Sequence, residues 1–310
     1  MGEPVLVGTV TLDLLHEGPI GAGRSPVVLR WGGVMNNMAC ALGMRGADPA
    51  LVTASYTGEL AGAVGAHLAD NQVRWTPLPA TSSLPVFHAE LASGSVQHKV
   101  FLADNAMTAL TPAGLGAQPS LFDGAGVVVA GTDAEEGTLA WLADAARARA
   151  VPFWMLSADP TEVSKLQPHG RTADLVALNL AELSRWAGRP PTGRADIAGT
   201  ARELVAPGGR CLVTLGSEGA LLVAAGDEVL FQPAPAIDNP SLTVGAGDVM
   251  LGCLLAARLT GAGWAAALAQ ASAFTGVFLR GLASARNPYH VLRGPVPQAA
   301  AGIARTPAAR

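Results

Sequence analysis

The chain has 310 residues, of which half are hydrophobic and only 14% are charged, and its net charge is −4. This composition allows a large buried core, in one α/β domain or in two smaller ones. It also argues against nucleic acid as a partner, because no Lys/Arg cluster is long enough to follow a phosphodiester backbone. No apolar stretch reaches the roughly 18 to 20 residues of a membrane span.

The start of the chain and its cysteines indicate the expected compartment. Residues 1–8 contain no basic region and no cleavage site of the secretory kind, so we expect a cytoplasmic protein. Cys40, Cys211 and Cys253 are odd in number, far apart and set among apolar neighbours. They are therefore expected to be buried free thiols rather than disulfide partners or metal ligands, and the six histidines show no metal-ligand spacing.

The first elements bring polar residues to the end of a strand. Residues 4–10 read as a buried strand that ends near Asp13, where open α/β sheets bind ligands, although a solvated loop acid is the alternative. A second strand at 27–31 leads into Gly32 and Gly33, which precede a helical pattern without obstructing its N-terminus. Asn37 lies in the first turns of that helix, where it can hydrogen-bond a small polar ligand.

A hairpin then interrupts the alternation of strands and helices. After a strand at 50–54 and a helix at 59–69, residues 85–91 and 96–102 read as two strands joined by a short polar turn. We expect this hairpin to form a small flap that projects from the main sheet.

The alternation returns in the rest of the chain and predicts a mainly parallel sheet that is covered by helices on both faces. Residues 221–224 follow a tight turn and are expected to pair antiparallel at an edge. Residues 286–310 look less regular. The expected strands are 126–130, 151–156, 175–178 and 211–215, and the expected helices are 135–149, 181–187, 197–205, 246–259 and 264–280.

The stretch from Leu242 to Asp248 carries the strongest chemical signal. Gly245 and Gly247 keep side chains away from a loop that opens a buried helix, and such a helix end is an anion site. Asp248 beside an anion site indicates a base rather than a phosphate ligand. The alternative is a tight turn in which Asp248 only caps the helix.

Four motifs in the correct order resemble those of the PfkB (ribokinase-like) carbohydrate and nucleoside kinases. They are Gly32-Gly33-x-x-x-Asn37-x-Ala39, Asn179-x-x-Glu182, Thr214-x-Gly216-x-x-Gly219 and Gly245-Ala246-Gly247-Asp248. The resemblance implies one α/β domain over residues 1–310, a ribokinase-like three-layer αβα sandwich with a mainly parallel sheet and a small β lid. The lid would be formed by parts of 13–31 and 82–103.

The resemblance also implies a reaction, the transfer of the γ-phosphoryl group of ATP to a hydroxyl of a sugar or nucleoside, with Mg²⁺ as cofactor. Asp248 matches the catalytic base, and the N–H groups of Gly245, Ala246 and Gly247 match the anion hole. Glu182 would hold Mg²⁺ through water. The matches on the acceptor side are Asp13, Gly32, Gly33, Asn37 and Lys165, and those on the nucleotide side are Asn179, Thr214, Gly216, Gly219 and Asn287. From the residues alone, Asn179 also reads as a turn residue and Glu182 as part of a solvated helix face.

Within the family, short traits resemble pseudouridine kinases. They are Gly32-Gly33-Val34, Thr81-Ser82-Ser83 and Lys165, and they imply a pseudouridine 5′-hydroxyl as acceptor, with a free pentose or hexose as the alternative. Asn36 and Glu162 depart from that branch. Leu242-Thr243-Val244 departs from the family pattern and leaves open whether a monovalent cation binds.

Two other classes of function compete with a kinase. A Rossmann dehydrogenase needs a glycine fingerprint after the first strand, which residues 8–12 do not provide. A non-catalytic ligand-binding protein on a kinase fold is disfavoured by the intact Asp248 behind an intact anion hole. Because exposed flap edges favour pairing, we also expect two flaps to meet in a homodimer.

Overall fold

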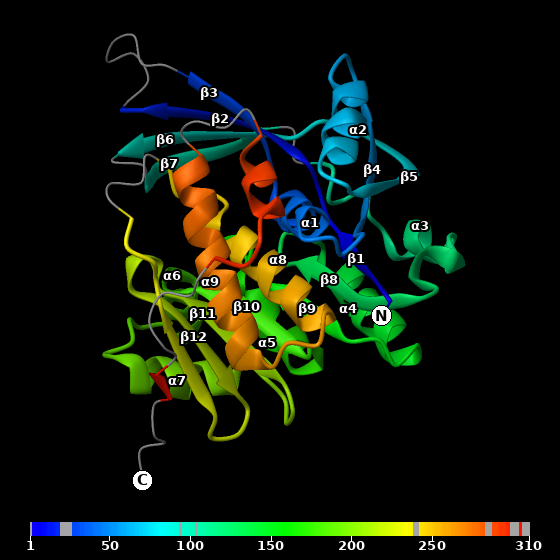
Figure 1. Ribbon diagram of the computed structural model, residues 1–310. Coiled ribbons are helices and arrows are strands. Elements are labelled where there is room, and N and C mark those ends of the chain that lie inside the picture. Colours follow the sequence, from blue (N-terminus) through cyan, green and yellow to red (C-terminus); the bar gives the residue numbers. More distant parts are fainter. Residues whose placement is uncertain are drawn as a thin grey trace.

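The computed structural model describes residues 2–18, 27–92, 95–102, 105–237, 242–282, 287–297 and 304–305. Its strands form one large and one small β-sheet (Figure 1). Within the described residues the large sheet has ten strands, in the order β14-β13-β12-β11-β10-β9-β8-β1-β4-β5. The neighbours from β11 to β5 pair in parallel, and β11 to β14 pair antiparallel. The bounds are β1 Glu3–Val7, β4 Ala50–Thr57, β5 Arg74–Ser83, β8 Ala125–Gly131, β9 Phe153–Leu156, β10 Leu175–Asn179, β11 Arg210–Thr214, β12 Gly219–Ala224, β13 Val229–Pro233 and β14 Ala304–Arg305.

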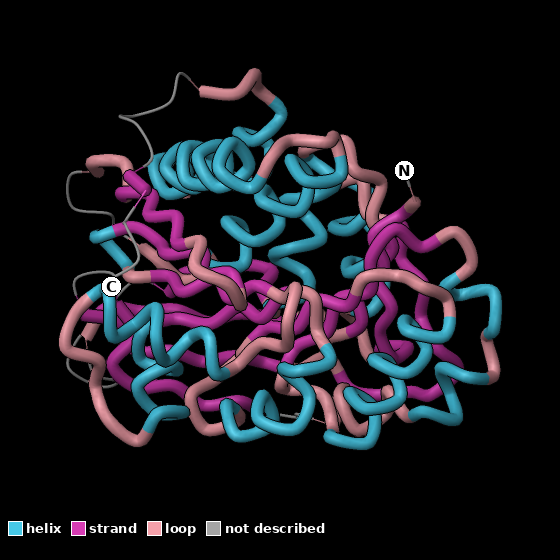
Figure 2. The backbone as a smooth tube through the Cα atoms, turned by 90° about the horizontal axis from the view of Figure 1, so that it is seen from below, coloured by secondary structure: helices cyan, strands magenta, loops and turns pink. Residues whose placement is uncertain are grey.

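Helices cover both faces of the large sheet and make a three-layer αβα sandwich (Figure 2). One face carries α1 (Val34–Met44), α2 (Ala61–Asp70), α8 (Ala246–Leu259) and α9 (Trp264–Gly281). The other carries α3 (Pro112–Gly116), α4 (Glu136–Ala148), α5 (Leu166–His169), α6 (Leu180–Ala187) and α7 (Arg194–Glu203). Short 3₁₀ helices are η1 (Pro119–Phe122), η2 (Val163–Lys165), η3 (Gly170–Thr172), η4 (Gly216–Glu218) and η5 (Pro288–Arg293).

A hydrophobic core lies between each helical layer and the face of the sheet that it covers. Both faces are apolar because neighbouring residues of a strand point to opposite faces. In β1, Leu6 belongs to the core under α8 and α9, whereas Val5 and Val7 belong to the core under α4 and α7. All three side chains are almost fully buried. This is the reason why the parallel strands read as continuous apolar runs.

The small sheet has the order β3-β2-β6-β7, with β2 Thr11–Glu17, β3 Val27–Gly32, β6 Val86–Ala92 and β7 Ser95–Leu102. It projects beside α9 in Figure 1. The predicted hairpin is confirmed as β6 and β7, while residues 93 and 94 of its turn lie outside the described residues. Residues 19–26, which belong to the predicted lid segment 13–31, also lie outside them.

The fold class is confirmed, and the structure corrects three local expectations. The first strand ends at Val7, so Asp13 lies inside β2 of the small sheet rather than at the end of β1. The strands β5 and β13 were not anticipated. β5 contains Pro77 and Pro79 and lies at the edge of the large sheet, where proline is tolerated and the apolar pattern is weak.

The cysteine expectation is confirmed, since Cys40, Cys211 and Cys253 are buried and free. Among the described residues, none of the helices is both long enough and apolar enough to cross a membrane. Of the irregular segment 286–310, the structure describes 287–297 and 304–305, which include η5.

Candidate active site

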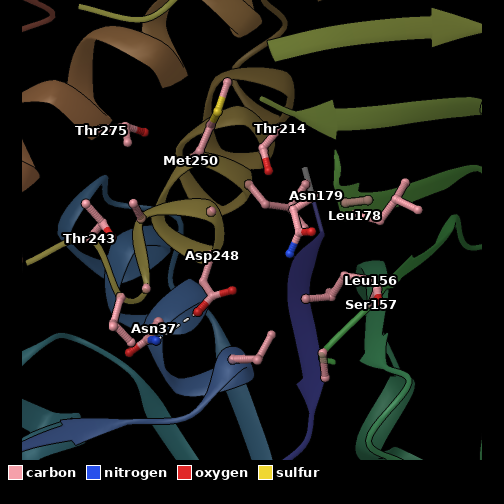
Figure 3. Close-up of a pocket in the computed structure, with 18 of the residues that line it drawn as sticks. Asn37, Leu156, Ser157, Leu178, Asn179, Thr214, Thr243, Asp248, Met250 and Thr275 are labelled. Atoms are coloured by element: carbon pink, nitrogen blue, oxygen red, sulfur yellow. Dashed lines mark hydrogen bonds between the residues drawn. The ribbon is translucent and has the colours of Figure 1, made fainter. Parts of the chain in front are cut away.

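A cavity of about 1340 Å³ lies where the carboxyl ends of the central parallel strands meet α8 and the small sheet. Figure 3 shows Asn37 and Asp248 on one side of it and Asn179 and Thr214 on another. Most of the predicted site residues line this cavity. They are Asp13, Gly33, Asn37, Asn179, Glu182, Thr214, Gly216, Gly219, Gly245, Ala246, Gly247 and Asp248.

The predicted glycine loop forms the N-terminus of α8. Gly245 is the N-cap residue and has a φ of 84°, a left-handed conformation that favours glycine. The backbone N–H of Ala246 donates to the carbonyl of Thr243 at 3.1 Å, so this predicted anion-hole donor is already hydrogen-bonded. A Cβ atom added to Gly247 would meet no heavy atom within 4 Å. The loop therefore presents the positive end of a helix to open cavity space at Gly247.

Asp248 lies in the first turn of α8 and is held by one side-chain hydrogen bond, which Asn37 Nδ2 donates to Asp248 Oδ2 at 2.8 Å (Figure 3). Burial raises the pKa of Asp248 to about 7. The hydrogen bond from Asn37 and the positive charge of Arg30 lower it, but they do not offset the burial. A half-buried carboxyl group whose pKa lies near neutrality has the properties of a general base.

Asp13 faces the cavity from β2 and is held by its neighbours in the small sheet. Thr11 Oγ1 donates to Asp13 Oδ1 at 2.7 Å, and Arg30 Nε lies 3.6 Å from Asp13 Oδ2. Gly32 does not line the cavity, but a Cβ atom there would overlap the carboxyl group of Asp13. Gly33 has a φ of 97° at the start of α1, where a side chain would press on the carbonyl of Thr9. The two glycines thus allow Asp13 and the N-terminus of α1 to approach each other.

Asn179 and Glu182 form a capping box at the start of α6. Asn179 Oδ1 accepts from the backbone N–H of Glu182 at 2.9 Å, and Glu182 Oε2 accepts from that of Asn179 at 2.7 Å. Both residues also line the cavity, which the helix-cap function alone does not require. Burial raises the pKa of Glu182 to about 7, and the negative charges of Asp248 and Asp159 add to this effect.

Comparisons with known proteins identify the family. Residues 10–285 match the model of the pfkB family of carbohydrate kinases. The chain belongs to the PfkB family. The family is one of kinases, which is the expected class of phosphotransferase with an alcohol group as acceptor.

Individual relatives agree with this assignment. This PfkB chain is 41% identical to a 1-phosphofructokinase from Rhodobacter capsulatus over 103 residues. The aligned segment covers 33% of this chain and 32% of the relative. The match thus spans about a third of the length of that curated relative.

Solved structures of kinases share the fold of this chain at sequence identities below 25%, and three of them serve as examples. An adenosine kinase from Sinorhizobium meliloti has a TM-score of 0.77 at 15% identity, over 91% of this chain and 94% of that one. The ribokinase of Arabidopsis thaliana, complexed with ribose and ATP, has a TM-score of 0.72 at 19% identity, over 94% and 98%. Phosphofructokinase-2 from Escherichia coli, in complex with substrates and products, has a TM-score of 0.72 at 23% identity, over 90% and 93%.

The carboxylates of this PfkB chain suit a magnesium ion that keeps water and phosphate ligands. Within the described part of the chain, no group of three or more His, Cys, Asp or Glu side chains could hold a metal ion by itself. Glu182 nevertheless faces the cavity, and the negative charge of Asp248 adds to the rise of its pKa. Mg²⁺ commonly binds through one or two carboxylates together with waters and substrate phosphates. The donor set therefore fits Mg²⁺ only together with a nucleotide.

Besides Gly32, the predicted site residues Lys165 and Asn287 do not line the cavity of this PfkB protein. Lys165 donates to the carbonyls of Thr132 and Ala134 at 2.9 and 3.0 Å, so its charge supports the loop after β8. Asn287 caps η5, because its Oδ1 accepts from the backbone N–H of Tyr289 at 3.1 Å. The Lys165 contacts join segments 33 and 31 residues apart, which motif matching does not detect, whereas this Asn287 contact is local.

Several residues that line or support the cavity lie outside the PfkB motifs, so the sequence analysis did not predict them. Arg30 donates to the carbonyl of Val244 at 2.9 Å and so ties the small sheet to the loop before α8. Lys99 of β7 forms an ion pair with Asp159, and both line the cavity. Phe87 and Phe101 line it from β6 and β7. The alternation of the hairpin strands could have assigned these side chains to one face, but not to the cavity.

Proposed function

We propose that this protein transfers the γ-phosphoryl group of ATP, with Mg²⁺, to a hydroxyl group of a nucleoside or sugar. The observation that carries the proposal is the half-buried carboxyl group of Asp248, which lies at the N-terminus of α8 and lines the cavity. A base beside an anion site is what phosphoryl transfer from ATP to an alcohol requires. When bound, Mg²⁺ would neutralise charge on the transferred phosphate, and Glu182 is the residue proposed to hold it through water.

The residues have different tasks in this reaction. Asp248 would accept the proton of the acceptor hydroxyl, and the backbone N–H of Gly247, in the first turn of α8, would bind the phosphoryl group. Asp13 would orient the acceptor, since its Oδ2 lies beside Arg30 and its Oδ1 is fixed by Thr11. Asn179 and Thr214, at the ends of β10 and β11, would contact the nucleotide.

The far side of the cavity supports a nucleotide. Its lining beyond Thr214 includes Met250 of α8 and Thr275 of α9 (Figure 3). Leu212 of β11 and Leu279 of α9 also line the cavity. Such a largely apolar surface with a few hydroxyl groups suits a flat aromatic base. The likeness in fold to a ribokinase that was solved with ribose and ATP agrees with this assignment.

The acceptor side favours a nucleoside over a free sugar. Register pairing aligns Asp13 with Phe87 and Phe87 with Phe101, so one row on one face of the small sheet carries a carboxyl group followed by two aromatic rings. The ring centroids of Phe87 and Phe101 lie 5.0 Å apart. A hydroxyl-bearing molecule with an aromatic ring matches this row, because its ring can stack on phenylalanine. We therefore propose pseudouridine, through its 5′-hydroxyl, as the first acceptor to test.

A phosphoryl-transfer screen tests the proposal. ATP and Mg²⁺ are incubated with the protein and with pseudouridine, uridine, adenosine, ribose or a hexose, and product is detected by mass. Highest kcat/KM on pseudouridine supports the full proposal, whereas equal or better turnover of ribose or a hexose overturns the nucleoside assignment. No acceptor-dependent product with any of these compounds would contradict the kinase activity itself.

Replacement of Gly247 is predicted to block the nucleotide without damaging the fold. A valine there meets no protein atom within 4 Å of its Cβ, but it occupies the space through which a phosphate approaches the N–H groups. We expect the affinity for ATP to fall by at least about tenfold, as for the loss of one hydrogen bond to a charged group. Calorimetric titration measures this affinity.

Gly245→Val is the matched variant for this prediction. Its Cβ would lie 3.0 Å from Asn37 Nδ2, at a positive φ, so it should lower thermal stability as well as ATP affinity. Unchanged ATP affinity in a folded Gly247→Val protein would mean that the loop has only a structural function.

We further propose that two copies of the chain associate through their small sheets. Leu29 and Val100 are 62% and 51% exposed on the two outer strands of that sheet. Exposed apolar edge strands favour pairing with a second copy. We expect sedimentation to give a dimer, and Leu29→Glu with Val100→Glu to give a monomer. A wild-type protein that sediments only as a monomer at assay concentration would contradict this prediction.

A further inference from the structure

Tyr289 is a buried side chain outside the cavity that contacts the proposed catalytic centre through one other residue. It lies in η5, only 4% of it is exposed, and its ring stacks on Phe278 with centroids 5.5 Å apart. Its hydroxyl group donates to Asn37 Oδ1 at 2.5 Å, and Asn37 Nδ2 donates to Asp248 Oδ2 at 2.8 Å. The three side chains form one continuous chain of hydrogen bonds.

The direction of these hydrogen bonds fixes the orientation of the Asn37 amide. An asparagine side chain carries an acceptor oxygen and a donor nitrogen at its two ends, and either can face a given partner. A protonated phenol has one O–H group to donate, and Tyr289 donates it to Asn37 Oδ1. Burial raises the pKa of Tyr289 well above its ordinary value, so its hydroxyl remains protonated at neutral pH. With Oδ1 accepting from Tyr289, Nδ2 faces Asp248, whose carboxylate can only accept.

Tyr289 is itself held rigidly at both ends of η5. Asn287 caps the element and its Nδ2 donates to Asp70 Oδ2 of α2 at 2.8 Å. At the other end, Arg45 after α1 donates to the carbonyls of Leu292 and Gly294 at 2.7 and 2.8 Å. The position of the phenol therefore follows from contacts to α1 and α2, the same layer that carries Asn37.

We propose that Tyr289 is a positioning residue for phosphoryl transfer: it locks the amide of Asn37 so that its nitrogen donates to Asp248 and keeps that carboxylate oriented and ionised. This inference rests on the proposed kinase function. It gives Asn287, which the motif comparison assigned to the nucleotide, a different function, namely to place Tyr289.

The ionisation of Asp248 depends on every charged group that faces it. Arg30 from β3 favours the carboxylate, whereas Asp13 from β2, Asp133 after β8 and Glu182 of α6 disfavour it. The hydrogen bond from the Asn37 amide lowers the pKa of Asp248. If the amide is free to turn, its oxygen can face the carboxylate instead, which favours the protonated acid.

The test compares Tyr289→Phe with Tyr56→Phe. Tyr56 is the matched control, because its hydroxyl is also buried and accepts from the backbone N–H of Val10 at 2.7 Å, but it has no hydrogen bond to Asn37 or Asp248. Both variants lose hydrogen bonding of a buried tyrosine hydroxyl and should lose thermal stability. The pH profile of kcat/KM for ATP is measured for each, together with the Asp248 carboxyl ¹³C resonance, which is assigned by its absence in Asp248→Asn.

In Tyr289→Phe we expect the acid limb and the ¹³C titration to move upward together by about one pH unit, a tenfold change in the ionisation equilibrium. The same variant should show kcat reduced about fivefold near pH 7, the wild-type pKa of Asp248, with little change in KM. Tyr56→Phe should leave both titrations unchanged. If Asp248 titrates at the same pH in Tyr289→Phe and in Tyr56→Phe, the proposal is wrong.

A second measurement does not depend on activity or on folding of a variant. In the wild-type protein, the side-chain NH₂ resonances of Asn37 should shift with pH in step with Asp248, because the nitrogen faces the carboxylate. Resonances that do not respond as Asp248 titrates would overturn the proposal. A wild-type protein that gives this titration but phosphorylates no acceptor would contradict the kinase function and leave the positioning contact in place.

Discussion

Asp248→Asn is expected to lower kcat by about 10²- to 10⁴-fold, because an amide cannot accept the proton of the acceptor hydroxyl. The substitution keeps the shape of the side chain and an oxygen that can accept from Asn37 Nδ2, a hydrogen bond of 2.8 Å in the wild type. It also keeps an oxygen near the N-terminus of α8. The fold and the affinity for ATP should therefore change little, and kcat should carry the effect.

The pH profile makes this prediction sharper. Since burial raises the pKa of Asp248 to about 7, the carboxyl group is protonated, and inactive as a base, as the pH falls through 7. Wild-type kcat/KM for ATP should therefore decrease below pH 7 and level off above pH 8. Glu182 has a pKa raised to about 7 as well, so Asp248→Asn should remove one of two ionisations from the profile.

Asp144→Asn is the matched control, because it neutralises a carboxylate that is exposed on α4, where it pairs only with Arg147. It should leave kcat and the pH profile unchanged. Near-normal kcat in Asp248→Asn, together with a loss of several degrees in Tm, would mean that Asp248 serves as a helix cap. That outcome would remove the central argument for the kinase function.

Asp13→Ala is expected to lower kcat/KM for the acceptor by about 10²-fold, because a hydrogen bond to an ionised group contributes about 1.5–3 kcal/mol. Asp13 is only 2% exposed and faces the cavity from β2. Its removal deprives the acceptor of a carboxylate and leaves Arg30 without its ion-pair partner. The proposed ATP site is at the other end of the cavity, so the affinity for ATP, measured by calorimetry without acceptor, should not change.

Gly32→Ala tests the same contact by a second route. The added methyl group would overlap the Asp13 carboxyl group and displace it without removing any charge. We expect a higher KM for the acceptor and an ATP affinity like that of the wild type. If Asp13→Ala weakens ATP and acceptor binding equally, Asp13 supports the cavity as a whole rather than the acceptor.

The sequence allowed the fold class and much of the cavity lining to be predicted because both depend on local patterns. Continuous apolar strands that alternate with helices require a covered parallel sheet, and the large sheet has this arrangement. Gly245 and Asp248 were recognisable because a helix start without side chains is a local feature of the backbone. The strand β5 was missed because an edge strand that contains two prolines lacks the apolar period on which prediction relies.

The tertiary structure alone decided which distant side chains meet. Tyr289 and Asn37 are 252 residues apart in sequence, and Arg30 reaches the carbonyl of Val244 across 214 residues. Lys165 was predicted to contact substrate, yet its amine holds the carbonyls of Thr132 and Ala134. The physical reason is that a sequence motif specifies the backbone of its own segment, whereas the direction of a buried hydrogen bond depends on how the layers pack. The sequence by itself determined a kinase-like helix N-terminus with a carboxylate beside it, and the packing of η5 and the small sheet against α1 and α8 decided how that carboxylate is oriented and ionised.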